Sequence, residues 1–284
     1  YKCFLSSESF DEGKIMRIME QYNEAQVTKE NYYSINFSDT YLSKKNMRKV
    51  GYIRDDIDRK HKAKEINSRE RAILITSLLY AIDRIANTVG HYDAYRKKGD
   101  LDKSLELRFP ILKQINVENE IYKEDANMLV RKVKADICYL DPPYNSRQYC
   151  DAYHFLENVA NNEKLEVYGT ARKMDRSKLK SDYCKSRAKL AFEDLIENLE
   201  AKYILLSYNN TAGKANARSN AKISDDDILE ILNKKGDTKI FVTEFNPFST
   251  GKTKIQNHEE RVFLCTVGKF DNNEKNSMKK IKTQ

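Results

Sequence analysis

Apolar residues recur at helical spacing through the first third of the chain. Residues 10–25 and 44–60 each place apolar side chains three and four positions apart, so that these side chains share one face of a helix. A longer helix is predicted to begin at Ser68, which can cap it, and to end at Gly90. The first third is therefore predicted to be mainly helical.

Strand patterns dominate the second half. Short apolar runs predict strands at 119–122, 135–140, 202–207, 239–245 and 261–267. Helical patterns are found between them at 128–132, 153–160, 187–199 and 224–234. This order implies a doubly wound α/β sheet, with strand 135–140 buried and the last two strands forming a hairpin at the sheet edge.

The sequence Asp141-Pro142-Pro143-Tyr144 directly follows the predicted strand 135–140. The two prolines cannot donate to a strand ladder, so they predict a rigid turn at the carboxyl end of the strand, where open α/β sheets bind ligands. A carboxylate, rigid carbonyls and an aromatic ring suit a flat heterocycle that carries an exocyclic amine. Asp141 and the Pro142 carbonyl would accept the amine hydrogens, and Tyr144 would stack on the ring. The alternative is that the motif is only a turn.

The composition favours a polyanionic partner. The 284 residues include 51 Lys and Arg against 43 Asp and Glu, a formal net charge of +8, and a basic protein neutralises phosphates well. The length allows one catalytic domain and one insertion of roughly 100 residues. No apolar run has the length of a membrane span and no signal-peptide pattern opens the chain, so a cytoplasmic location without membrane association is predicted.

The five cysteines are scattered and include no Cys-x-x-Cys pair. An odd number without metal-ligand spacing predicts reduced thiols. His154 is similarly isolated and is predicted to be structural. No metal is expected, because a site that works by positioning an amine does not need one.

Six further segments, together with Asp141–Tyr144, give the chain a resemblance to one known protein family. They are Tyr32–Ser34, Tyr41–Asn46, Asp83–Thr88, His91–Tyr95, Glu124–Asn127 and Leu206–Asn210. With Asp141–Tyr144, they make the chain resemble the D12 class of DNA adenine-N6 methyltransferases, including type II modification enzymes, over most of residues 30 to 266. The resemblance implies transfer of a methyl group from S-adenosylmethionine to the N6 amine of a flipped-out adenine in a specific sequence of double-stranded DNA. It also implies a Rossmann-like class I methyltransferase sheet and a mainly helical target-recognition insertion.

The resemblance implies roles for particular residues. The catalytic residues would be Asp141, Pro142, Pro143 and Tyr144, and the cofactor would be bound by Asp125, Ala126 and Asp141. A helix cap is a competing role for Asp125. Contacts with DNA are expected from Tyr41, Lys44, Asn46, His91, Tyr92, Tyr95, Arg96, Asn145, Arg147 and Tyr149.

Two segments have alternative interpretations. The loop between Asn87 and Gly99 mixes aromatic and basic residues, which suits bases and phosphates. By composition alone, a solvated helix end with core-facing tyrosines is the favoured interpretation, and the resemblance reverses this preference in favour of DNA contact. The charged segment 161–185 would clamp DNA or remain solvated.

The resemblance predicts four regions. Residues 1–27 would be an N-terminal part of the catalytic domain, 28–115 the target-recognition insertion, 116–270 the catalytic methyltransferase domain and 271–284 a polar tail.

The glycine-rich turn that normally holds the methionine part of S-adenosylmethionine has no counterpart here. Nine glycines occur, and none forms a closely spaced pair. Because the chain also starts at Tyr1, we expect this turn in a missing upstream segment or in a separate chain. The alternatives for function are a noncatalytic DNA-binding or specificity subunit and an RNA adenine methyltransferase.

Overall fold

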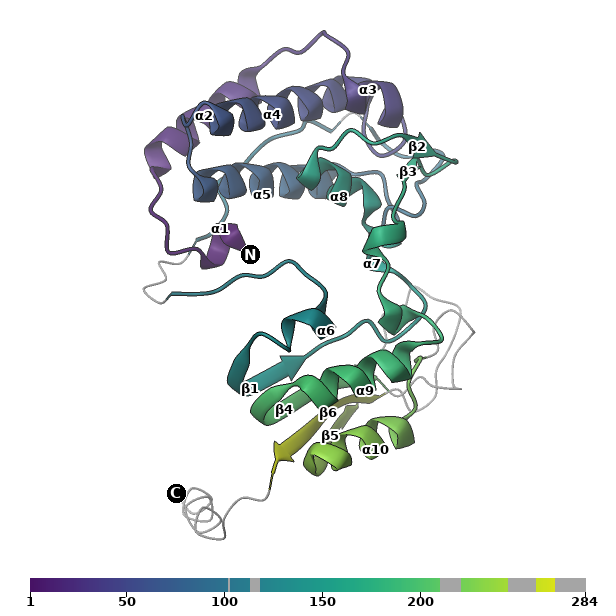
Figure 1. The fold of residues 1–284 in the computed structure, drawn as a ribbon. Coiled ribbons are helices and arrows are strands. Elements are labelled where there is room, and N and C mark those ends of the chain that lie inside the picture. Colours follow the sequence, from purple (N-terminus) through teal and green to yellow (C-terminus); the bar gives the residue numbers. More distant parts are fainter. Residues whose placement is uncertain (102, 113–117, 210–220, 245–258, 269–284) are drawn as a thin grey trace. The chain divides into compact units, whose positions relative to one another are not determined.

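The computed structural model describes residues 1–101, 103–112, 118–209, 221–244 and 259–268, and the predicted tail 271–284 lies outside them. The chain divides into two compact units (Figure 1). Unit 1 contains Tyr1–Ile121 and Tyr149–Leu179, and unit 2 contains Tyr122–Gln148 and Lys180–Gln284. These bounds differ from the predicted functional regions, which stay predictions.

Unit 1 is mainly helical. Its elements are α1 (Lys2–Leu5), α2 (Glu12–Glu24), α3 (Tyr32–Phe37), α4 (Lys44–Lys62), α5 (Ser68–Ile85), α7 (Tyr149–Ala152), α8 (His154–Asn161), the strands β2 (Val167–Tyr168) and β3 (Lys173–Met174), and the 3-10 turn η1 (Ser177–Leu179). The two antiparallel strands and η1 lie within the predicted charged loop. The helices predicted at 10–25, 44–60 and 153–160 are confirmed.

Helix α5 begins and ends differently from the sequence prediction. Its cap is Asn67, not Ser68: the Asn67 side chain accepts the Glu70 N–H at 2.9 Å, and the Glu70 carboxylate accepts the Asn67 N–H at 2.9 Å. The helix ends at Ile85, before Gly90. It ends early because the Asn87 N–H bonds outside the helix, to the Tyr41 carbonyl at 2.8 Å.

A buried arginine joins α4 to α8. Arg54 is fully buried and donates to the carbonyls of Val159 at 2.7 Å and Ala160 at 3.1 Å. These carbonyls belong to the last turn of α8, which has no helical partners for them. Arg54 also pairs with Asp58 at 2.8 Å. Burial opposes ionisation of Asp58, but hydrogen bonds from Arg54, Asn162 and Arg71 outweigh it and hold the pKa of Asp58 at about 2.

Unit 2 is a mixed α/β structure. Its four-stranded sheet has the order β1-β4-β6-β5, with β1 parallel to β4 and the other pairs antiparallel. The predicted pairing of the last two strands at a sheet edge is confirmed. The elements of this unit are α6 (Ala126–Leu129), β1 (Lys134–Leu140), the 3-10 turn η2 (Asp182–Cys184), α9 (Ala188–Asn198), β4 (Glu200–Asn209), α10 (Asp225–Lys235), β5 (Gly236–Glu244) and β6 (Glu259–Val267).

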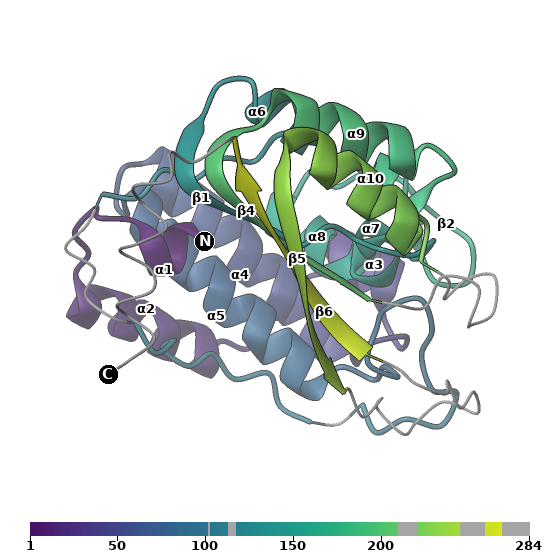
Figure 2. The same cartoon turned by 90° about the horizontal axis from the view of Figure 1, so that it is seen from below.

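Helices α9 and α10 lie side by side against the sheet (Figure 2). They cover the face that carries Ile204, Leu206, Phe263 and Cys265, all of which are buried. Burial also raises the pKa of the Cys265 thiol. The core of this unit therefore lies on one side of the sheet.

Strand β1 is not the buried strand that its sequence predicts. Ile137 and Tyr139 are 62% and 61% exposed, whereas Cys138 and Leu140 pack against the core of unit 2. Among the described strands β1 pairs with β4 only, and the helices cover one of its faces. An apolar run shows that a strand favours burial, but it does not show what covers the strand.

Two further elements differ from prediction. Residues 119–122 form no strand. The helix expected at 128–132 is α6, which runs from Ala126 to Leu129 and so begins two residues earlier than predicted. No helix in the described part of the chain has the length and apolarity needed to cross a membrane.

Candidate active site

The loop 141–148 continues directly from β1 at the carboxyl end of the sheet. Leu140 pairs with Leu206 of the parallel strand β4, so Asp141 lies at the same sheet end as residues 207–209. Asp141 is exposed, and Pro142, Pro143 and Tyr144 are half-buried. The four residues predicted to be catalytic therefore lie together at a strand end, with the carboxylate open to an incoming ligand.

Tyr208 and Lys222 fix the middle of this loop. The Tyr144 carbonyl accepts the Lys222 N–H at 2.7 Å and the Tyr208 hydroxyl at 3.3 Å. The same hydroxyl accepts the Ile223 N–H at 3.2 Å, and the two tyrosine rings meet edge to face, with centroids 6.2 Å apart. Burial raises the pKa of Tyr208 to about 12, so its hydroxyl keeps its proton at neutral pH.

Gln148 fixes the end of the loop. Its side chain is paired with the backbone of Ser181: Nε2 donates to the Ser181 carbonyl at 3.0 Å, and Oε1 accepts the Ser181 N–H at 2.8 Å. Within the loop, the Asn145 side chain accepts the Arg147 N–H at 2.9 Å, a local turn that asparagine favours. The loop is thus held at two points.

Sequence reasoning missed the roles of Gln148 and Tyr208. Tyr208 belongs to the segment Leu206–Asn210, which resembles the D12 class and is predicted to lie at the end of a strand. Nothing in the local sequence indicates that its side chain contacts Tyr144. The partner of Gln148 is 33 positions away, and no periodicity or motif connects the two.

Asp125 caps helix α6. Its Oδ1 atom accepts the N–H groups of Asn127 at 3.0 Å and Met128 at 3.2 Å, which confirms the predicted capping role. The Asn127 side chain donates to the Ala191 carbonyl at 2.8 Å and so ties α6 to α9. Asp125 and Ala126 are both exposed, and their cofactor role stays a prediction.

Three residues that were predicted to contact DNA are buried inside unit 1. Tyr41 and Tyr92 are 0% and 1% exposed, and Asn46 is 6% exposed. The Tyr41 hydroxyl lies within hydrogen-bonding distance of the Tyr92 and Ala171 carbonyls and has one proton to share between them, and the Asn46 amide donates to the Lys103 carbonyl at 2.7 Å. Their polar groups are used internally, which gives these three residues a packing role in the structure, and their contact with DNA stays a prediction.

The other predicted DNA-contacting residues have accessible surface. Arg96, Arg147, Tyr149 and Lys44 are exposed, and Lys44 forms an ion pair with Glu30. Those that are half-buried are His91, Tyr95 and Asn145. Contact with DNA remains a prediction for all seven.

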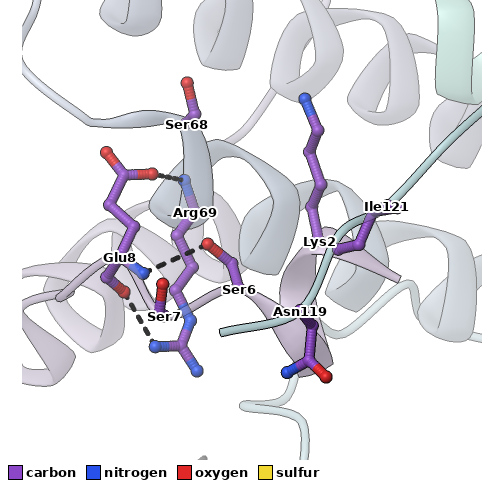
Figure 3. Close-up of a pocket in the computed structure, with 8 residues that line it drawn as sticks. All are labelled: Lys2, Ser6, Ser7, Glu8, Ser68, Arg69, Asn119 and Ile121. Atoms are coloured by element: carbon purple, nitrogen blue, oxygen red, sulfur yellow. Dashed lines mark hydrogen bonds between the residues drawn. The ribbon is translucent and has the colours of Figure 1, made fainter. Parts of the chain in front are cut away.

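A pocket in unit 1 contains none of the predicted site residues (Figure 3). Its lining includes Glu8 and Arg69 at the start of α5. The Glu8 carboxylate accepts the Arg69 N–H at 3.0 Å, and the Glu8 carbonyl accepts from the Arg69 guanidinium at 2.8 Å. The chain's own carboxylate therefore already occupies this helix end. No group of three or more His, Cys, Asp or Glu in the described part of the chain is arranged to hold a metal ion.

Comparison with known families identifies the class. Residues 8–214 match the model of the D12 class N6 adenine-specific DNA methyltransferases. This match covers more than half of the chain, and the chain therefore belongs to that family.

Curated relatives include several modification methylases. The chain is 40% identical over 208 residues to modification methylase StsI of Streptococcus sanguinis, an alignment that covers 71% of the chain and 30% of the relative. It is 34% identical over 225 residues to the type II methyltransferase M.NlaIII of Neisseria lactamica, covering 77% and 63% respectively. The chain thus spans less than two thirds of the length of either relative. No solved structure matches it significantly.

Proposed function

We propose that the protein to which this chain belongs transfers a methyl group from S-adenosylmethionine to the N6 amine of adenine in double-stranded DNA. The observation that carries the proposal is the loop 141–148. It presents the Asp141 carboxylate at a strand end and is held by Tyr208 and Gln148, in a chain of the D12 family. A role in restriction and modification, as the names of the relatives suggest, and a cytoplasmic location shared with the DNA complete the proposal.

The residues of the loop have distinct tasks in this mechanism. The target adenine leaves the base stack, because its amine is otherwise paired. Asp141 and the Pro142 carbonyl accept the two N–H bonds of the amine and orient its lone pair, and Tyr144 stacks on the base. S-adenosylmethionine supplies an electrophilic methyl group when bound. Because the loop is held before substrate arrives, little reorganisation opposes the reaction.

The described residues suit only part of the cofactor. Both cap bonds of Asp125 use Oδ1, which leaves Oδ2 to accept from the amino group of the cofactor adenine, beside Ala126. Asp141 would border the site from the loop. The sequence has no closely spaced glycines to let the backbone approach the methionine part. A Rossmann-like methyltransferase sheet, with target recognition by residues 28–115, therefore requires a further segment.

The exposed side of β1 suits that further segment. Parallel strands are normally covered on both faces, yet Ile137 and Tyr139 are exposed, and β1 pairs with β4 only among the described strands. We infer that a strand carrying the glycine-rich turn pairs with the edge of β1 away from β4, and that the rest of the same segment covers the face with Ile137 and Tyr139. It would come from upstream in the same polypeptide or from a separate chain.

Replacement of Asp141 tests the mechanism. With Asp141→Ala, methyl transfer to a labelled duplex by the full protein should fall below detection, because the amine loses its charged acceptor. Folding, followed by circular dichroism, and nonspecific affinity for the duplex should be retained, because Asp141 is exposed and has no packing role. Substantial turnover by the variant would contradict the proposed role.

A noncatalytic DNA-binding or specificity subunit is the second candidate. The net charge of +8 and the lack of a glycine pair favour it. It would leave the Asp141–Tyr144 loop without a use. A labelled duplex separates the two: the second candidate predicts binding of the duplex without methylation, even when the upstream sequence or partner chain is present. An RNA adenine methyltransferase would instead modify RNA.

A further inference from the structure

Two segments of unit 1 that are far apart in sequence are fixed to each other. One is the loop 88–99, and the other is the β2–β3 hairpin, residues 167–174, which follows α8 (Figure 1). The buried Tyr41 hydroxyl lies 2.7 Å from the Tyr92 carbonyl of the loop and 2.9 Å from the Ala171 carbonyl of the hairpin. An ion pair between Asp93 and Lys173 adds a second link.

The loop is also fixed to the rest of unit 1. The Asn87 side chain donates to the carbonyls of Thr40 at 3.1 Å and Arg96 at 2.8 Å. Gly99 packs so closely on this side chain that a Cβ atom would lie 1.9 Å from the Asn87 Oδ1 atom. The Tyr92 N–H donates to the Ala152 carbonyl at 2.6 Å. The loop is therefore held near both ends and in the middle.

The hairpin turn is similarly defined. The N–H of Arg172 donates to the Gly169 carbonyl at 3.1 Å. Gly169 has a φ of +70° and Arg172 a φ of +53°, left-handed conformations that close a short hairpin. Met174 is buried and anchors the base of the hairpin.

The exposed cations of the two segments form no ion pair with a carboxylate of the described residues, whereas the carboxylates of these segments have partners. Arg96, Lys97, Lys98 and Arg172 are exposed, and no ion pair joins them to a carboxylate of the described residues. Asp93 is paired with Lys173, and Glu166, beside the hairpin, accepts the Tyr168 hydroxyl at 2.6 Å. Exposed cations without an ion pair to a described carboxylate also occur elsewhere in unit 1, as at Arg17 and Lys62, but here four of them lie on two segments that are fixed to each other. The two segments therefore form a surface with excess positive charge.

We propose that the loop 88–99 and the hairpin 167–174 form one preformed surface, the basic face, that binds the sugar–phosphate backbone of duplex DNA. Tyr41 is its positioning residue. The inference rests on the proposed function for its ligand, and charge complementarity selects that ligand, because phosphates attract cations that lack internal partners. Cations on a fixed backbone also lose less conformational freedom on binding. Tyr41 thus acts through the surface it holds, although it is itself buried.

A paired substitution tests the basic face. Lys97→Ala with Arg172→Ala removes one cation from each segment, and the matched control, Arg17→Ala with Lys62→Ala, removes two exposed cations elsewhere in unit 1. Binding of a duplex without the target site is measured against salt concentration, with no cofactor. Each lost phosphate contact lowers the slope of log K against log salt by about 0.9. The test variant should lose about 2 from the slope and the control should lose none.

Tyr41→Phe tests the positioning role. The ring keeps its packing, but the hydroxyl that holds the hairpin is lost, so duplex affinity should fall while the melting temperature changes little. In an Arg172→Ala background the same substitution should change affinity much less, because the cation that it positions is already gone. A merely structural role for Tyr41 would give additive effects, which would overturn the assignment.

The outcomes separate this inference from the proposed function. An unchanged slope in the test variant, or an equal loss in the control, would overturn the basic face alone. Binding of RNA without binding of duplex DNA would overturn both. Loss of methyl transfer in Asp141→Ala with normal salt dependence would support both, since methyl transfer and backbone binding belong to different residues.

Discussion

The Tyr208 hydroxyl connects three segments with a single group. It donates to the Tyr144 carbonyl, accepts the Ile223 N–H and belongs to a residue near the end of β4. Because burial raises its pKa to about 12, this donor persists throughout the pH range in which an enzyme would be assayed. At the scale of residues, Tyr208 therefore helps to hold the loop rigid, and Asp141 is the residue proposed to bind the amine.

Tyr208→Phe should lower kcat about fivefold and leave KM for DNA nearly unchanged. The reason is that one hydrogen bond of about 1 kcal/mol is lost from the loop, whereas the ring contact with Tyr144 is kept. The control is Tyr80→Phe, because Tyr80 is 53% exposed on α5 and lies outside the loop 141–148 and the strands that hold it. Steady-state kinetics with a cognate duplex measure both variants. An unchanged kcat for Tyr208→Phe would refute its positioning role.

The residues that could be predicted from sequence are those whose role is set locally. The prolines at 142 and 143 end β1 by their own chemistry, and Asp125 caps α6 with the next turn of chain. The burial of Tyr41 could not be predicted, and for Tyr92 a core-facing position was one of two interpretations, because an aromatic residue beside cations has the same sequence pattern in a core and on a DNA-binding surface. Only tertiary packing distinguishes the two.

At the scale of elements, α8 is linked to the loop 88–99 through a buried histidine. His154 is 1% exposed, and its Nε2 atom lies 2.9 Å from the Tyr92 carbonyl and 3.1 Å from the Tyr41 hydroxyl. Burial lowers the pKa of His154 to about 4, and the nearby charges of Lys173 and Arg176 act in the same direction. The imidazole is therefore neutral in the folded protein at neutral pH.

This histidine should make unit 1 sensitive to acid. Its folded pKa lies below the ordinary value of 6.5, so the unfolded chain binds more protons between pH 6.5 and 4, and stability falls as the pH falls through that range. From pH 7 to 4.5 the wild type should lose about 2 kcal/mol more unfolding free energy than His154→Gln. Urea unfolding at the two pH values measures this. Parallel losses in the two proteins would contradict it.

The positions of the helices and strands along the chain could be predicted better than what packs against them. Helical periodicity located α2, α4, α8 and α9 because their apolar faces pack within the described residues. The same reasoning predicted a buried β1 and was wrong, because its apolar run has no cover there on one face. The charged segment 161–185 hid the β2–β3 hairpin, since strands of two residues have no detectable period.

At the scale of the whole molecule, the proposed amine-binding loop belongs to unit 2 and the proposed DNA-binding face belongs to unit 1. The glycine-rich part of the cofactor site would come from the segment that pairs with β1. This division explains why the chain belongs to the methyltransferase family and yet has no closely spaced glycines.

The chain of residues 1–284 alone should therefore bind S-adenosylmethionine weakly or not at all. In their proposed roles, Asp125 and Ala126 would contact the adenosine part only. Isothermal calorimetry measures the affinity, and the longer polypeptide or the chain with its partner is the positive control. Micromolar binding by residues 1–284 alone would show that no further segment is needed.

The most direct test of the central claim is the identity of the methylated product. Duplex DNA is incubated with the full protein and S-adenosylmethionine, digested to nucleosides and analysed by mass spectrometry. The account predicts N6-methyldeoxyadenosine with the wild type and none with Asp141→Ala. Methylation of another base, or an equal yield of N6-methyldeoxyadenosine from the two proteins, would contradict it.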